Sequence, residues 1–220
     1  MFIRFCAVLF TAALLSISCT HTPPTYPDHW WVGVSGERPR WEILPDQVKP
    51  PQVILSKRNE LGVLSNFAAT PFLFQGSKYA SLEGFWQATK FPENKNDPRF
   101  ALAKWPYTRQ QVSQMVAFEA KRAGDFASRV MKKNKIDWVS FQGQRMSYRA
   151  KGESDFYRLI RSAMVEKVQQ NTRVKKILMA TGDLVLKPDH HQKADAPLAW
   201  KYFDIYMSFR EQLKAGKRLQ

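Results

Sequence analysis

The stretch that decides the fold runs from Leu64 to Phe91 and reads LSNFAATPFLFQGSKYASLEGFWQATKF. Its first half has a short aromatic run, Pro71 to Phe74, and a shorter segment, Ser77 to Tyr79, on either side of Gln75-Gly76. Because glycine tolerates the positive φ that a tight turn requires, this pattern predicts a β-hairpin. A small hairpin that leads into a helix is therefore expected here.

The second half of the stretch has the pattern of an α-helix. Ser81 is a typical N-cap residue and Pro92 cannot continue a helix, so a helix is predicted up to about Phe91. At about 100° per residue, one face carries Glu83, Trp86, Gln87 and Lys90. The helix dipole favours an ionised carboxylate in the first turn by a few tenths to about 1 kcal/mol. The pattern fits either a charged functional carboxylate at Glu83 or an ordinary amphipathic helix with its polar face in water.

Three sequence blocks, which follow one another along the chain, together resemble a known family. The blocks are Ser65-Asn66-Phe67 with Glu83-x-x-Trp86-Gln87-Ala88-x-Lys90-Phe91, then Glu119-Ala120-Lys121-Arg122-x-Gly124, then Lys167-Val168-Gln169-Gln170-Asn171 with Ala180-Thr181-Gly182-Asp183. Together they resemble the NADAR family, the YbiA-like N-glycosidases, between about Val53 and Leu213. The resemblance implies an α+β fold, a mostly helical single domain with a small β-hairpin.

The resemblance also implies a function, the hydrolysis of an N-glycosidic bond in a ribose-phosphate or ADP-ribose-like compound. Glu83 is then the catalytic carboxylate. The implied substrate-binding residues are Arg58, Asn66, Phe67, Trp86, Lys90 and Asp183. Lys57, beside Arg58, is a further candidate phosphate contact, although a solvated charged loop explains both residues equally well. The alternative function is a non-catalytic nucleotide- or ADP-ribose-binding envelope lipoprotein on the same fold.

Two positions depart from the family's pattern and leave the substrate open. Gly84 stands where the family has His beside the carboxylate, and the segment from Asp195 to Tyr202 replaces a glycine-rich run. Asp189-His190-His191 invites a metal hypothesis but lacks the spacing of an established metal motif. No metal and no cofactor is therefore expected.

The N-terminus predicts export. Arg4 is followed by an apolar run, Phe5 to Ile17, which has the length of a signal-peptide core and is too short to span a bilayer as a helix. The run ends in Leu14-Leu15-Ser16-Ile17-Ser18-Cys19, which resembles a bacterial lipoprotein lipobox. Cleavage would remove residues 1–18 and leave Cys19 as the only cysteine, the predicted lipidation site. A periplasmic protein cut near Ser18 and a cytoplasmic protein with a buried thiol are the alternatives.

Residues 19–51 are predicted to be a Pro/Trp-rich tether. Seven of the 13 prolines lie there, and they leave few backbone donors for regular structure. The segment also contains Trp30, Trp31 and Trp41, so it is either a free linker or a strap that buries its indoles on the domain. The remaining residues, 52–220, form the NADAR-like domain, which is long enough for a hydrophobic core.

The net charge of +15 indicates anionic partners. No helix-turn-helix, RNP sequence or zinc finger is present, so no specific nucleic-acid reader is indicated. The predicted partners are a phosphorylated ribosyl or ADP-ribosyl small molecule and, through Cys19, a membrane.

Several other elements are predicted from caps and periodicity. A helix is expected to start at Asp97-Pro98, and another to run from Thr108 to Gly124 behind a Thr108-x-x-Gln111 capping box. Further helices are expected over about 137–149, 155–171, 173–180 and 200–213. Strands are expected at 53–55 and 184–186. On the 137–149 helix, Arg145 and Arg149 would share a stripe with Trp138. These arginines would either hold a diphosphate or reach from the core to water.

Overall fold

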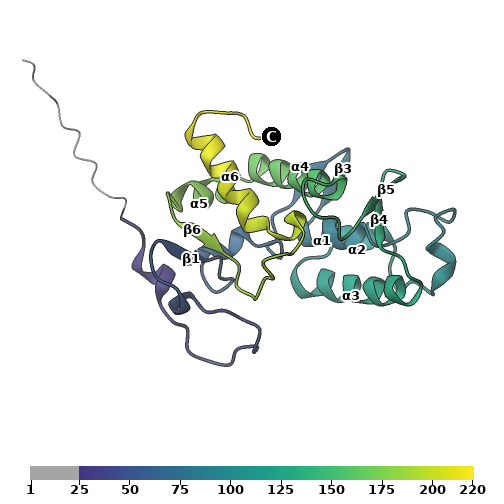
Figure 1. Ribbon diagram of the computed structural model, residues 1–220, viewed down its shortest axis with the longest axis horizontal. Coiled ribbons are helices and arrows are strands. Elements are labelled where there is room, and N and C mark those ends of the chain that lie inside the picture. Colours follow the sequence, from purple (N-terminus) through teal and green to yellow (C-terminus); the bar gives the residue numbers. More distant parts are fainter. Residues whose placement is uncertain (1–24) are drawn as a thin grey trace, which may run out of the picture.

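The short helix α1 (Leu82–Ala88) lies at the centre of the computed structural model, which describes residues 25–220 (Figure 1). All seven of its residues are buried, because α2 (Arg109–Ser113), α3 (Ala117–Lys133) and α4 (Asp155–Gln170) pack around it. The alternative of a helix with its polar face in water is therefore wrong. The α-helix also ends three residues earlier than predicted, and tighter turns carry the chain on to Phe91.

The predicted hairpin before α1 is confirmed. Strands β2 (Phe72–Phe74) and β3 (Ser77–Tyr79) are antiparallel, with Phe72 opposite Tyr79. Gln75 and Gly76 both have positive φ, 49° and 77°, as a two-residue hairpin turn requires. The predicted cap is also present, since the Ser81 hydroxyl accepts a hydrogen bond of 2.9 Å from the Gly84 N–H.

A second pair of strands joins distant parts of the chain. Strands β1 (Gln52–Ile54) and β6 (Val185–Lys187) are parallel, with Val53 opposite Leu186, so both predicted strands are confirmed within one residue.

The helix predicted over 137–149 is wrong. The chain forms an antiparallel pair there, β4 (Trp138–Phe141) and β5 (Gln144–Ser147). Its turn has positive φ at Gln142 (48°) and Gly143 (79°), a conformation that a helix cannot contain. The expected arginine stripe is consequently divided. The Arg145 guanidinium lies 4.3 Å from the Trp138 ring centroid, whereas Arg149 lies 5.8 Å from that of Trp200.

The other helices follow the predictions in part. Helices α4, α5 (Thr172–Ala180) and α6 (Tyr202–Lys214) are confirmed, and with the strands they establish the predicted α+β class. The capping box of α2 is present, but this helix ends at Ser113 and a new helix, α3, begins at Ala117. Gly124 therefore lies inside a helix instead of ending one. Only a 3-10 turn follows Asp97-Pro98. The 3-10 turns are η1 (Asp28–Trp31), η2 (Pro45–Gln47), η3 (Glu60–Leu64), η4 (Phe100–Leu102) and η5 (Leu198–Trp200).

Helix α1 separates two hydrophobic clusters. Phe85 and Trp86 belong to the larger cluster, which also contains residues of α4, α5 and α6. Ala88 belongs to the smaller cluster, with residues of α2 and α3. Since apolar residues on both sides of α1 are buried, its polar side chains are enclosed as well.

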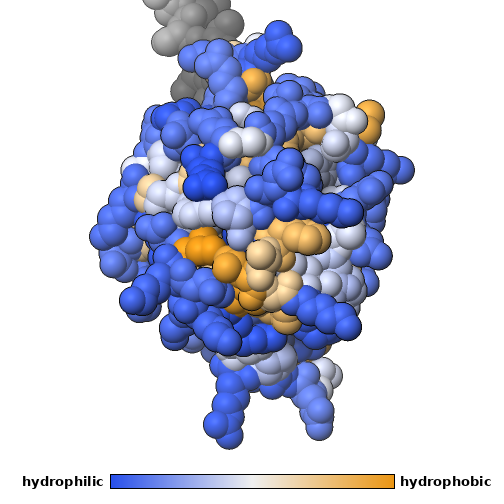
Figure 2. Space-filling view, turned by 90° about the vertical axis from the view of Figure 1, so that its right-hand side faces the viewer, coloured by the Kyte–Doolittle hydropathy of each residue, from blue (hydrophilic) through white to orange (hydrophobic). Residues whose placement is uncertain are grey.

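Figure 2 shows the right-hand end of the view in Figure 1, a mostly hydrophilic surface with one hydrophobic area near its middle.

The segment before β1 packs on the domain. Trp30 is 1% exposed, and its indole donates a 2.6 Å hydrogen bond to Glu60. Trp31 donates to the Gln52 carbonyl at 2.8 Å. Trp41, in contrast, stays 40% exposed. The residues that the structure describes from this segment thus form a strap, while Cys19 and the predicted signal lie outside the described part of the chain.

Lys167 on α4 is fully buried and gives the fold a pH dependence. Its Nζ donates a 2.8 Å hydrogen bond to the Ser65 carbonyl, and burial lowers its pKa to about 7. Above pH 7 the folded state releases this proton, whereas the unfolded chain keeps it up to about pH 10.5. The free energy of unfolding is therefore expected to rise with pH in this window, by up to about 1.4 kcal/mol per unit.

We expect Lys167→Met to remove this gain. Urea unfolding gives the free energy of unfolding at pH 7 and at pH 9, and the change between the two pH values is compared between wild type and variant. Lys176→Met, on the exposed side of α5, is the control and should keep the wild-type pH dependence. Equal pH dependence in wild type and Lys167→Met would contradict the assignment.

Candidate functional site

The carboxylate of Glu83 is the centre of the candidate site. The residue is 6% exposed, and its Oε1 accepts a 2.7 Å hydrogen bond from Gln87 Nε2, one helical turn later. Burial raises the pKa of Glu83, although the Gln87 hydrogen bond and the nearby Lys90 and Lys121 ammoniums oppose this rise. Enclosure thus acts against the charged form of Glu83 that the first helical turn favours. A carboxyl group with a raised pKa is suited to exchange protons with a substrate.

Gln87 is held in place by the close approach of α3. An added Cβ at Gly124 would lie 1.6 Å from Gln87 Oε1, so a side chain at position 124 would displace the amide. Gln87 Oε1 is buried and has no hydrogen-bond partner among the described residues. Gly124 therefore makes room for the group that positions Glu83.

Lys90 and Trp86, on the same face, have different surroundings. Lys90 Nζ donates a 3.1 Å hydrogen bond to Ser128 and lies 4.9 Å from the ring centroid of Tyr148. The Trp86 indole donates to the Tyr148 hydroxyl at 3.1 Å and packs against Phe156 in the larger core cluster. Lys90 is thus near the carboxylate and electrostatically coupled to it, whereas Trp86, predicted as a substrate contact, is 7% exposed and packed as a core residue.

Asn66 and Phe67 adjoin the N-terminus of α1. The Asn66 carbonyl accepts a 2.9 Å hydrogen bond from the Glu83 N–H, and its Oδ1 is buried without a hydrogen-bond partner in the described residues. The Phe67 carbonyl accepts from the Ala117 N–H at 3.2 Å, which ties this loop to the start of α3. The structure therefore brings the Asn66 backbone to the N-terminus of α1 and the Phe67 backbone to the start of α3.

Arg58 and Asp183 form ion pairs. Arg58 makes two hydrogen bonds, of 2.7 and 2.6 Å, to the Glu42 carboxylate in the N-terminal strap. Asp183 pairs with Lys214 on α6, and its side chain is 79% exposed. Their roles in substrate binding stay predictions.

Lys57, the other predicted phosphate contact, pairs with Asp189. That carboxylate is 1% exposed, and burial alone would raise its pKa, but the His190 hydrogen bond and Lys57 outweigh burial and lower it. The Asp189 carboxylate is thus occupied by a lysine and a histidine. Within residues 25–220, no group of three or more His, Cys, Asp or Glu side chains is arranged to hold a metal ion.

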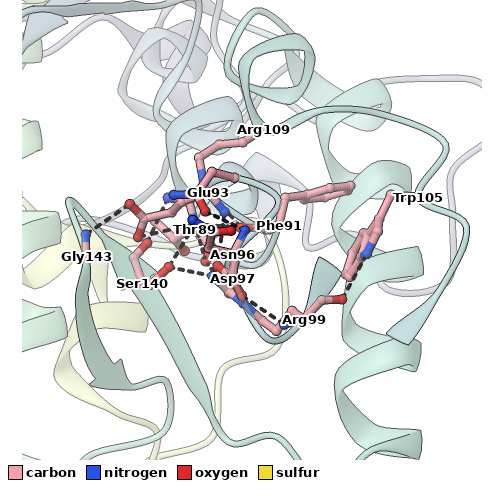
Figure 3. Close-up of polar contacts among 11 residues, drawn as sticks. Thr89, Phe91, Glu93, Asn96, Asp97, Arg99, Trp105, Arg109, Ser140 and Gly143 are labelled. Carbon is pink, nitrogen blue, oxygen red and sulfur yellow. Dashed lines mark hydrogen bonds and ion pairs between the residues drawn. The ribbon is translucent and has the colours of Figure 1, made fainter. Parts of the chain in front are cut away.

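A cavity of about 520 Å³ lies on the opposite side of α1, where Phe85, Ala88 and Thr89 line it. Arg109 also lines the cavity, and Figure 3 shows how Arg99 and Arg109 converge on Ser140 and on backbone carbonyls.

These arginines have structural roles. Arg109 donates 2.6 and 2.9 Å hydrogen bonds to the carbonyls of Phe91 and Ser140, and burial lowers its pKa to about 10. Arg99 is fully buried and pairs with Asp97. The two guanidiniums donate hydrogen bonds to backbone carbonyls after α1 and to Ser140 on β4, so this cluster connects α1 to β4. The sequence pattern did not predict it.

Comparisons with known proteins place the chain in a family. The model of the bacteriophage protein GP30.3 family matches residues 58–207, more than half of the chain, so the chain belongs to this family. No curated protein matches. Among solved structures, the chain is similar to the NMR structure of the E. coli protein YbiA, with 20% identity and a TM-score of 0.43 over 77% of this chain and 89% of that one. No helix in the described part is long and apolar enough to cross a membrane.

Proposed function

We propose that the chain hydrolyses an N-glycosidic bond in a ribose-phosphate or ADP-ribose-like compound, with Glu83 as the catalytic carboxylate. The supporting observation is the burial of this carboxylate, which is 6% exposed, accepts a hydrogen bond from Gln87 and has a pKa raised by burial. Burying a carboxylate is costly, and buried carboxylates with a raised pKa are typical of functional sites. The resemblance to the NADAR family assigns the same residue.

The chemistry of the reaction matches this environment. Breaking the bond between sugar and base develops positive charge at the anomeric carbon, which a carboxylate stabilises, and it requires an activated water molecule. The free Oδ1 of Asn66 is an acceptor for a sugar hydroxyl, and Lys90 is the nearby cation for a phosphate or hydroxyl. Glu83 either stabilises the cationic transition state or takes the proton from water.

The purified protein and a panel of ribosylated compounds test the proposal. Chromatography is expected to detect release of the base from at least one compound. The alternative is a binding protein on the same fold without catalysis. Binding by calorimetry with no base release from any compound would select that alternative.

We also propose that the chain is exported and carries a lipid on Cys19. The sequence contains only two cysteines, and Cys6 lies within the predicted signal, so a matched pair of variants tests the site. Cys19→Ala is expected to abolish palmitate labelling and to release the protein from membranes or block its processing. Cys6→Ala should leave labelling intact. Labelling that persists in Cys19→Ala would contradict the anchor.

A further inference from the structure

Three aromatic side chains from separate segments meet beside the Glu83 site. We call Trp41, Phe67 and Phe118 the aromatic platform. The ring centroids of Phe67 and Phe118 are 5.1 Å apart, and those of Trp41 and Phe118 are 6.2 Å apart. Trp41 is 40% exposed and Phe118 47% exposed, so both present ring surface to solvent. Large exposed aromatic groups that cluster are typical of binding surfaces.

A cation accompanies the platform. Lys57 Nζ lies 5.0 Å from the ring centroid of Phe67 and 5.6 Å from that of Trp41, and Asp189 holds it there. The ion pair with the buried Asp189 fixes the ammonium beside the rings, and the Lys57 side chain is 27% exposed, so an anionic ligand group can approach it.

The platform is continuous with the carboxylate. Phe67 follows Asn66, whose carbonyl accepts the Glu83 N–H. Phe118 lies on the first turn of α3, and Lys121, one turn later, is close enough to lower the pKa of Glu83 against the effect of burial. Two of the three platform residues therefore lie on segments that adjoin Glu83, namely the Asn66-Phe67 loop and the first turn of α3.

Trp41 is held in position by the strap that carries it. The next residue, Glu42, pairs with Arg58 and forms a β-bridge with His190. The Ile43 N–H donates a 2.8 Å hydrogen bond to the Asp189 carbonyl. The indole is thus presented by a fixed backbone. Trp41 also lies outside residues 58–207, the part that the family model matches.

We propose that the aromatic platform stacks the base of a nucleotide whose ribose lies at Glu83, and that Trp41 makes the N-terminal strap part of the substrate site. This inference rests on the proposed function and specifies its substrate class. An exposed aromatic face binds any base by stacking, and Lys57 provides the matching charge for a phosphate. The strap then determines affinity for the base, whereas Asn66 and Lys90 bind the sugar.

Calorimetry with AMP and with ribose 5-phosphate tests the inference, because the two probes differ only in the base. In a Glu83→Gln background, which prevents turnover, Trp41→Ala is expected to weaken AMP binding about tenfold or more. Binding of ribose 5-phosphate should stay within about twofold, and Trp41→Phe should restore most of the AMP affinity. Phe118→Ala, also at an exposed position, should act in the same direction. The control is Tyr107→Ala, an aromatic residue exposed to a similar degree, 41%, in the loop before α2.

The outcomes separate this inference from the proposed function. Unchanged AMP affinity in Trp41→Ala, equal loss for both probes, or no binding of either probe would overturn the platform. Base release by wild type together with Trp41-independent binding would reject the platform and keep the hydrolase. AMP binding that depends on Trp41, without base release from any compound, would support the platform and reject the hydrolase.

Discussion

Glu83→Gln is expected to fold and to bind a ribosylated ligand, but to hydrolyse it at least about a hundredfold more slowly than wild type. Glutamine has the same shape, and its side-chain oxygen can still accept the hydrogen bond from Gln87. It lacks the charge that stabilises an oxocarbenium-like transition state or activates water. Single-turnover kinetics on the substrate with the fastest base release measures the loss.

Although Glu83→Gln is expected to lower activity, it is expected to maintain or raise the stability of the fold. Burial raises the pKa of Glu83, so its contribution to stability is fully present below pH 4.5 and is lost as pH rises through the folded pKa. Above the folded pKa of Glu83, a neutral glutamine removes the cost of the buried charge, and the melting temperature should equal or exceed that of wild type.

The control for Glu83→Gln is Glu119→Gln, on the exposed side of α3, which should change neither activity nor stability. Wild-type hydrolysis by Glu83→Gln would place the chemistry elsewhere. A marked loss of stability would show that the carboxylate has a structural role.

Gly84→Ala is expected to destabilise the domain by about 1–3 kcal/mol, the usual cost of overpacking a core. An added Cβ would lie 2.5 Å from the Met115 carbonyl oxygen and 3.1 Å from that of Ser113, and both are backbone atoms. Either α1 or the α2–α3 connection must move. The melting temperature should fall by about 2–4 °C per kcal/mol. The α2–α3 connection thus occupies the space that a side chain at position 84 would need.

Gly33→Ala is the matched control. Its Cβ would also meet an atom at short distance, Asp46 Oδ2 at 2.6 Å, but Asp46 is an exposed side chain that can rotate away. Thermal unfolding should therefore show little change in Gly33→Ala. Equal melting temperatures for wild type and Gly84→Ala would show that the α2–α3 connection yields without cost.

Local signals predicted the elements around the site. The hairpin at Gln75-Gly76, the Ser81 cap and the Thr108 capping box are each determined by a few neighbouring residues, and each is confirmed. The error over 137–149 arose because aromatic and basic residues there also have helical spacing. Gln142-Gly143 repeats the dipeptide of the first hairpin turn and was the signal for a second hairpin.

The candidate site was harder to predict, because its environment depends on contacts between distant segments. The sequence placed Glu83, Gln87 and Lys90 on one helical face, but that face is polar and resembled a solvated one. The packing of neighbouring helices, including α3 over Gln87 at Gly124, encloses it. The platform unites positions 41, 67 and 118, and no local pattern relates these three.

The parallel pairing of β1 with β6 bears on how the protein is made. Val53 cannot find its partner until Leu186 has left the ribosome, so this contact closes a loop that includes α1 to α5. Such long loops are costly to close and slow the folding of a domain. The helices can form and begin to pack during synthesis, but the domain is completed only after β6 has been synthesised. A nascent chain that stalls before Val185 would present an unpaired β1 edge, a form suited to capture by chaperones.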